Sequence, residues 1–348
     1  MQKNALKGRC YIPLAVKSCK LTIAMDKVQD IMARWRALQP LSDREQELLS
    51  RRFTIDFNYN SNHIEGNTLT YGQTEILLLF GKIVGEAEAK DVQEMTASNV
   101  GLKMMKEEAC LKNVPLTQNF IRILHKTLLR EDYNGDRFEY ASPEETPALM
   151  TDLVDWYNEA EQSGKFTPIE LAAIFHYRYI RIHPFEDGNG RIARLMANYI
   201  LLRQGYPMIV VRSRKKNDYL EALHKTDLTV GASPSLGAHA SKRDIQQFLT
   251  YFTKLFVEEV TYNIRFLTER GDNVWWFDGE RVIFRSNSTS KILNLMYAVP
   301  DITIQKLSDE VGINVAAINK QLKQLTTKGF IQRVEKDGTW RLIITPSI

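Results

Sequence analysis

A run of twelve residues, 183–194, combines the side-chain types needed to bind a polyphosphate and to activate a hydroxyl group. It is His-Pro-Phe-Glu-Asp-Gly-Asn-Gly-Arg-Ile-Ala-Arg. Gly188 and Gly190 flank Asn189, and two glycines this close permit positive φ angles and leave bare backbone amides, which form anion-binding concavities. A histidine such as His183 titrates near neutral pH and can take a proton from an incoming hydroxyl.

The charged residues of this run fit the same chemistry. Asp187 offers a hard carboxylate oxygen of the kind that Mg²⁺ prefers when it bridges phosphates. Arg191 and Arg194 are three residues apart, so in a helix they lie on adjacent parts of one face, and each guanidinium can pair with two phosphate oxygens. A solvated turn followed by a helix cap is the alternative, but it leaves the joint occurrence of all these residue types unexplained.

Helices on both sides are expected to position the run. Residues 191–203 are predicted to form a helix with a broad apolar face, with Gly205 just past its end and Pro207 beyond. The N-terminus of that helix would present free amides and the positive end of its dipole to a phosphate. Thr167-Pro168 predicts the start of the preceding helix.

The pattern HPFx[D/E]GNGRxxR resembles the signature of Fic-domain proteins, and segment 167–182 resembles the helix that leads into it. The usual reaction of that family is AMPylation, the transfer of AMP from ATP to a protein hydroxyl with release of pyrophosphate. The resemblance therefore implies MgATP as a substrate. It also implies a target protein modified on Ser, Thr or Tyr, and self-modification.

The resemblance also assigns residues by position. His183 would be the base and Asp187 the Mg²⁺ ligand. The residues around the α-phosphate would be Gly188, Asn189 and Gly190. Arg191 would steady the β-phosphate and Arg194 the γ-phosphate. Phe185 would anchor the loop, and Tyr219 would line the adenine site, with simple core packing as the alternative for Tyr219.

A second motif, Ser61 to Gly66, is by itself a polar helix end that stops at glycine. It also matches [S/T]xxxE[G/N], which family members with an autoinhibitory helix carry. That resemblance implies an ion pair between Glu65 and Arg194, so that Arg194 is withheld from the γ-phosphate. Some family members use the same glutamate to position water and remove AMP, so the direction of the reaction stays open.

Composition sets wide limits. The chain has 348 residues, 44% apolar and 25% charged, with a net charge of +4, as in ordinary globular proteins. No apolar run approaches membrane-spanning length, and residues 1–25 lack a continuous apolar signal-type segment. The three cysteines have neither metal-site nor disulfide-framework spacing. We expect a cytoplasmic protein with no membrane partner. The oligomeric state, a homodimer included, and the choice among ATP, UTP and GTP stay open.

We predict a mostly α-helical chain: a Fic-type helical bundle followed by a small α+β winged helix-turn-helix. The expected parts are an irregular arm (1–25), an N-terminal helical region with the inhibitory motif (26–112), a Fic core (113–270), a linker (271–287) and the winged helix (288–348). The flap that Fic proteins place near 130–148 is expected to be short. His125 is expected to be a packing histidine, and Trp275 and Trp276 a buried pair that anchors the linker.

The C-terminal segment supports the winged-helix prediction. Three helical patterns precede two alternating strands around Lys336-Asp337-Gly338, which is a hairpin signal. The third helix, 315–328, would show four side chains able to contact bases or phosphates, Asn319, Lys320, Lys323 and Gln324. Residues 288–348 hold eight Lys and Arg against five Asp and Glu, a weak electrostatic footprint. DNA binding and a protein-interaction role therefore both stay open, as does a DNA-binding regulator whose Fic domain only senses nucleotide.

Overall fold

The computed structural model describes residues 14–128, 142, 144–269, 271–333 and 340–347. The bundle helices are α1 (Leu14–Ala37), α2 (Asp43–Ile64), α3 (Tyr71–Phe80), α4 (Ala89–Cys110), α5 (Gln118–Leu128), α6 (Thr146–Ser163), α7 (Pro168–Ile182), α8 (Asn189–Arg203), η1 (Ser213–Lys215), α9 (Lys216–Val230), α10 (Pro234–Ala238) and α11 (Gln246–Thr268). The C-terminal elements are α12 (Asn287–Ala298), α13 (Ile304–Val311), α14 (Val315–Thr327) and short strands β1 (Val274–Phe277), β2 (Glu280–Ile283), β3 (Ile331–Arg333), β4 (Trp340–Leu342) and β5 (Thr345–Pro346). The prediction of a mostly helical chain is confirmed.

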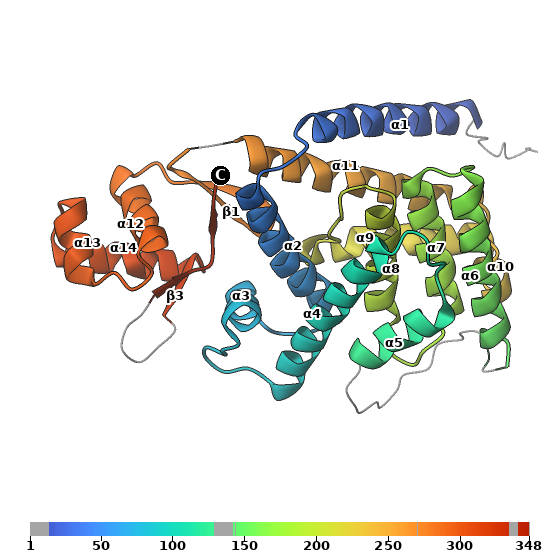
Figure 1. The fold of residues 1–348 in the computed structure, drawn as a ribbon, viewed down its shortest axis with the longest axis horizontal. Coiled ribbons are helices and arrows are strands. Elements are labelled where there is room, and N and C mark those ends of the chain that lie inside the picture. Colours follow the sequence, from blue (N-terminus) through green and yellow to red (C-terminus); the bar gives the residue numbers. More distant parts are fainter. Residues whose placement is uncertain (1–13, 129–141, 143, 270, 334–339, 348) are drawn as a thin grey trace, which may run out of the picture.

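Helices α7 and α8 form the centre of the bundle, where they pack against each other (Figure 1). Almost every side chain of α7 is buried, including Phe175, Tyr177 and Tyr179 at 0% exposure. A helix that is apolar on all sides has to be surrounded by other elements. Helices α6, α8, α10 and α11 supply those surroundings, α4 packs against α8, and α1 lies along the outer side of α11.

The expectation of an irregular arm over 1–25 is wrong for residues 14–25, because α1 begins at Leu14. No glycine or proline interrupts residues 14–37, so nothing in this stretch stops a helix from extending toward the N-terminus. Scattered basic residues among short apolar pieces do not by themselves exclude a helix. Residues 1–13 lie outside the described part of the chain.

Helix α2 runs between the bundle and the C-terminal elements (Figure 1). Its start is fixed by a capping box, in which Ser42 accepts from the Glu45 amide and Glu45 accepts from the Ser42 amide. Its last turns bury polar side chains, among them Asp56, Asn60 and Ser61. Buried polar groups require partners, so α2 is held by specific polar contacts as well as by apolar packing.

The C-terminal elements have the predicted order of three helices followed by a β-hairpin. Asn314 caps α14 by accepting from the Ala317 amide, and Ile318, Leu322 and Leu325 form the inward stripe of that helix. Strands β3 and β4 pair antiparallel, with Ile331 opposite Leu342. The predicted turn around Lys336-Asp337-Gly338 lies outside the described residues.

Segment 271–287, expected to be a linker, carries two strands. Strand β1 pairs antiparallel with β2 on one side and with β5 on the other. Trp275 is fully buried in the C-terminal core beside Ile292, whereas Trp276 is buried against Tyr262 and Phe266 of α11. The pair is buried as predicted, and alternation along a strand sends its two rings into different cores.

Two further expectations concern the flap segment and membrane-spanning helices. The short flap expected over 130–148 falls mostly outside the described residues, which omit 129–141 and 143. Within the described residues, no helix is both long and apolar enough to cross a membrane.

Candidate active site

The loop of the twelve-residue run begins where α7 ends. A capping box between Thr167 and Glu170 and a proline at the first helical position fix the start of α7. The helix ends at His183, which has a left-handed backbone with φ of 51°. Positive φ is costly for a residue other than glycine, so the surrounding structure must hold His183 in this conformation. The candidate base therefore has a defined position.

The loop is closed by the side chain of Asn189. Its Nδ2 donates to the Phe185 carbonyl at 2.5 Å, and its Oδ1 accepts from the Phe185 amide at 3.2 Å. Asn189 is 1% exposed, so this clasp is shielded from water. The structure thus gives Asn189 a role in shaping the loop, and its expected role at the α-phosphate stays a prediction.

His125, expected only to pack, contacts the loop directly. Its ring stacks on Phe185 with centroids 3.6 Å apart, and its Nε2 lies 3.1 Å from the Asp187 carbonyl oxygen. Phe185 is half-buried, with one face of its ring on His125 of α5 and other atoms packed on the hydrophobic core. No pattern near His125 in the sequence indicates this contact, which joins positions 62 residues apart.

The N-terminus of α8 supplies the expected anion position. Gly188 precedes the helix with φ of 79°, a conformation that glycine adopts at little cost. The Ile192 amide bonds to the Gly188 carbonyl, so the amides of the three residues before Ile192 have no intrahelical acceptor. Orphan amides and the helix dipole together favour an anion here.

A carboxylate occupies the space beside this helix end. Glu65 Oε1 accepts from Arg194 Nη2 at 2.6 Å, which is the ion pair that the resemblance implies. The same carboxylate lies so close to Gly190 that a Cβ at this position would collide with it. Ser61 completes the contact, since its Oγ and carbonyl oxygen accept from Arg194 at 3.0 and 2.9 Å.

Arg191 is 2% exposed and is paired on one side only. Its Nη2 donates to Asp187 Oδ2 at 2.9 Å, and its Nη1 lies 3.9 Å from Glu94 Oε1. Nε and Nη1 have no hydrogen-bond partner among the described residues. Buried guanidinium donors without partners are costly, and a phosphate oxygen would satisfy them. Glu94 was not anticipated, because a lone glutamate on α4 carries no motif.

Asp187 is suited to a metal that arrives together with phosphates. Its side chain is 47% exposed, and the described residues contain no cluster of three or more potential protein ligands for a metal ion. Mg²⁺ is usually held by one or two carboxylates plus phosphate oxygens and water, and a single exposed carboxylate fits that need. Asp187 Oδ2 also accepts from Arg191, and a carboxylate has enough lone pairs to bind a metal as well.

The imidazole of His183 is neutral in this environment. Burial lowers its pKa to about 4, even though the nearby carboxylates of Glu65 and Asp187 act in the opposite direction. A neutral imidazole carries a lone pair that can accept a proton.

Tyr219 is buried, at 3% exposure, and belongs to a polar chain behind Arg194. Its hydroxyl lies 3.1 Å from His176 Nε2 and also hydrogen-bonds to Arg194. Burial lowers the pKa of His176 to about 3, so that ring is neutral and can accept from the Tyr219 hydroxyl. These contacts support the position of Arg194, and the adenine-lining role expected for Tyr219 stays a prediction.

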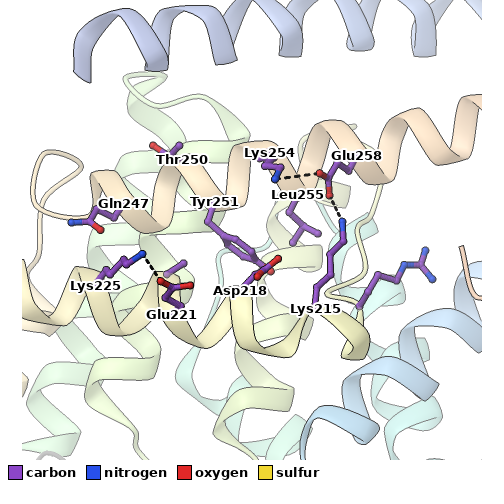
Figure 2. Close-up of a pocket in the computed structure, with 12 residues that line it drawn as sticks. Lys215, Asp218, Glu221, Lys225, Gln247, Thr250, Tyr251, Lys254, Leu255 and Glu258 are labelled. Atoms are coloured by element: carbon purple, nitrogen blue, oxygen red, sulfur yellow. Dashed lines mark hydrogen bonds and ion pairs between the residues drawn. The ribbon is translucent and has the colours of Figure 1, made fainter. Parts of the chain in front are cut away.

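A cavity of about 400 Å³ lies elsewhere, between α9 and α11. Figure 2 shows that its charged side chains are mostly paired: Lys215 and Lys254 with Glu258, and Lys225 with Glu221. Cations that are already neutralised exert little pull on a triphosphate. We therefore place the candidate site at the loop and not in this cavity.

Comparison with known proteins agrees with the geometry. The Fic/DOC family model matches residues 115–201. A solved structure of a Fic domain containing signaling protein from Bacteroides thetaiotaomicron is 50% identical, with a TM-score of 0.66 over 69% of this chain and 97% of that one. The chain belongs to the Fic family.

Curated Fic relatives are more distant. Protein adenylyltransferase fic-1 of Caenorhabditis elegans is 27% identical over 280 residues, which are 75% of this chain and 52% of that protein. Protein adenylyltransferase Fic of Nematostella vectensis is 31% identical over 49% of this chain and 42% of that protein. The chain therefore spans about half, or less, of the length of these two relatives. A solved structure of C. elegans Fic-1, residues 134–508, is 25% identical with a TM-score of 0.57 over 72% of each chain.

The C-terminal elements match a second family model. A winged helix-turn-helix DNA-binding model covers residues 285–332, which include α12, α13, α14 and β3. The chain is thus a Fic helical domain followed by a small winged helix-turn-helix, as the sequence predicts. The domain boundaries given in the sequence analysis stay predictions.

Proposed function

We propose that this Fic protein transfers AMP from MgATP to a Ser, Thr or Tyr hydroxyl of a target protein and of itself, and that Glu65 holds this activity low. The observation that carries the proposal is the carboxylate of Glu65 lying against Gly190 and Arg194, where the helix end would receive a phosphate. The carboxylate of Glu65 thus occupies the position in which the helix end would bind a phosphate. The relatives named protein adenylyltransferase supply the type of reaction.

The proposed reaction uses the loop residues as follows. His183 accepts the proton of the attacking hydroxyl, whose oxygen bonds to the α-phosphorus while the bond to the bridging β-phosphate oxygen breaks and pyrophosphate leaves. Arg191 and Arg194 bind the phosphates and offset the charge that develops on the leaving group. Asp187 would hold Mg²⁺ together with the phosphates, and the metal would supply further charge neutralisation.

The proposed inhibition by Glu65, called the brake below, follows from competition for the guanidinium of Arg194. Arg194, at 3% exposure, donates two hydrogen bonds to Ser61 of α2 and one to Glu65 at the end of that helix. While these contacts stand, Arg194 cannot pair with a terminal phosphate, so bound ATP lacks the contact that orients its α-phosphorus for attack.

A mass-spectrometric experiment tests the proposal. Purified wild type and Glu65→Gly are incubated with MgATP, and each is then digested and searched for an added AMP group. We expect the variant to carry AMP on a hydroxyl side chain and the wild type to carry little. Equal absence of AMP from both, also after incubation with cell lysate, would overturn the proposal. Parallel reactions with UTP and GTP decide the nucleotide.

Removal of AMP is the alternative within the family. Glu65 is 33% exposed in its side chain and interacts electrostatically with His183, so it lies where it could orient water near the base. A target modified beforehand distinguishes the two directions. Release of AMP by the wild type but not by Glu65→Gly would favour hydrolysis.

DNA binding by the winged helix is a second candidate function. The family model that matches residues 285–332 is described as DNA-binding, and Asn319, Lys320 and Lys323 of α14 are exposed. We expect a salt-dependent shift of duplex DNA by the full chain, weakened in Lys320→Ala/Lys323→Ala. Absence of any shift at low salt would leave a role in protein contact.

A further inference from the structure

The β1–β2 hairpin ends in a tight turn that touches the inhibitory helix. Its tip is Asp278-Gly279, with φ angles of 39° and 75°. Two successive positive φ values are typical of a type I′ turn, for which Asp-Gly is a favoured pair. Gly279 also permits close approach, because a Cβ here would lie 2.8 Å from Cζ of Arg212.

Asp278 makes polar contacts with two separate parts of the bundle. Its Oδ1 accepts from Asn60 Nδ2 at 2.9 Å and lies 3.2 Å from Arg212 Nη1. Its carbonyl oxygen accepts from Arg214 Nη1 at 2.6 Å. Asp278 is 17% exposed in its side chain, so these contacts are largely shielded from water.

The partners of Asp278 fix the position of α2. Asn60 is the residue before Ser61 on that helix, and its Oδ1 accepts from the Ser213 amide at 2.7 Å. One turn earlier, Asp56 pairs with Arg212 Nη1 at 2.8 Å. Arg212 is held in turn by Glu259 of α11 at 2.8 Å. An α-helix moves as a rod, so contacts at Asp56 and Asn60 also set where Glu65 lies.

The hairpin belongs structurally to the C-terminal sheet. Strand β1 pairs with β5, and Trp275 is buried in the winged-helix core. A second contact runs in parallel, since Ile343 packs with Ile55 of α2 and with Tyr71 of α3. The C-terminal module is thus joined to the helix that carries Glu65 by a polar contact at Asp278 and by apolar packing.

We propose that the Asp278-Gly279 tip is a latch that holds α2, and with it Glu65, against Arg194, so that the winged-helix module sets the strength of the brake. This inference rests on the proposed function for its activity readout. Two states of α2 are required, one latched and one released, and the tip contacts only the latched one.

Two substitutions open the latch from opposite sides. Asp278→Gly removes the side-chain contacts of the tip, and glycine still accepts the positive φ angle of this position. Asn60→Ala removes the side chain on α2 that contacts Asp278, and alanine is a good helix former, so the helix itself is preserved. Arg212 retains Asp56 and Glu259 in both variants, so no buried cation is left unpaired. The matched control is Glu280→Ala on the same hairpin, whose side chain pairs with Arg214.

The experiment measures AMP incorporation and amide hydrogen exchange on the full chain. We expect Asp278→Gly and Asn60→Ala each to raise self-modification at least about fivefold, and Glu280→Ala to leave it unchanged. In the double variant the two effects should add only in part, because the Asn60–Asp278 hydrogen bond is lost in each single variant while each also loses contacts of its own. In a Glu65→Gly background neither should raise activity further. A general loss of structure would lower activity, so it does not mimic this result.

Hydrogen exchange separates failure of the latch from failure of the proposed function. Amides of residues 61–65 should exchange faster in Asp278→Gly and Asn60→Ala than in the wild type and in Glu280→Ala. Wild-type exchange and wild-type activity in both latch variants, with Glu65→Gly active, would overturn the latch alone. Faster exchange without AMP transfer in any variant would preserve the latch and overturn the function.

Discussion

Glu65 Oε1 and Arg194 Nη2 lie 2.6 Å apart although 129 residues separate them in the chain. The guanidinium is buried, and the carboxylate is about one third exposed, so the pair is partly shielded from water. A charge-assisted hydrogen bond in such surroundings is worth more than a surface pair. Breaking this pair should change the affinity for MgATP more than it changes the stability of the fold.

Replacing Glu65 therefore tests the electrostatic part of the brake. We expect Glu65→Gly to bind MgATP at least about tenfold more tightly, which corresponds to about 1.4 kcal/mol. Glu65→Gln keeps the size but loses the charge and should lie between wild type and Glu65→Gly. Isothermal titration calorimetry gives the affinities. Equal affinities in all three proteins would show that Arg194 is not withheld from the nucleotide.

Replacing His183 separates catalysis from binding. In the Glu65→Gly background, His183→Ala should reduce AMP transfer by a factor of about 10² or more, because it removes the proton acceptor. MgATP affinity should change little, because the phosphates are expected on α8 and its arginines. Calorimetry and label incorporation on one preparation measure both quantities. A parallel loss of affinity would mean that His183 shapes the loop and does not act as a base.

The pH profile follows from the lowered pKa of His183, which burial brings from 6.5 to about 4. The neutral, proton-accepting ring therefore persists below pH 6.5, and the Glu65→Gly variant should keep its activity down to about pH 5 and lose it toward pH 4. The contribution of this ring to the free energy of unfolding changes with pH in the same direction as the activity. It is present above pH 6.5 and is lost as pH falls through 4. A half-maximal rate near pH 6.5 would contradict this environment.

His125 is expected to act through the loop. Its ring stacks on Phe185 and its Nε2 contacts the Asp187 carbonyl. We expect His125→Ala in the Glu65→Gly background to lower kcat by about tenfold, since small displacements of a catalytic loop are costly. His125→Phe keeps the stacking and should recover part of the rate. Unchanged kcat in His125→Ala would show that the Asn189 clasp alone fixes the loop.

Trp276 gives a prediction about stability alone. Its ring is 1% exposed and packs against Tyr262 and Phe266, so Trp276→Ala should lower the free energy of unfolding by about 3–5 kcal/mol. Chemical denaturation followed by circular dichroism measures the change. Trp340→Ala, a half-buried tryptophan of β4, is the control and should cost less. Similar losses for both would mean that Trp276 is not a central part of its core.

Local patterns in the sequence were enough to predict the loop and its flanking helices. They also gave the order of the winged-helix elements, since these depend on periodicity and on caps within a few residues. The Glu65–Arg194 pair came from the family resemblance and is present. Nothing local in the sequence could have indicated that His125 meets Asp187 or that Asn60 meets Asp278 across 218 residues. Such contacts depend on how the helices pack.

The two-residue strand β5 illustrates the same limit. Thr345 and Pro346 are too short a stretch to carry a strand pattern, yet they pair with Trp276 and Trp275. The missed helical residues 14–25 have a different origin. There the apolar spacing is weak and the helix has to be inferred from the lack of breakers.

The burial of neighbouring tryptophans in separate cores limits how the chain can be cut. Removing the last residues would take away β5, which pairs with Trp275 and Trp276 of β1, together with Ile344 of the core that buries Trp275. A shortened protein that lost activity would thus report on a damaged fold rather than on the missing module. The contribution of the winged helix is better measured by single substitutions in an uncut polypeptide.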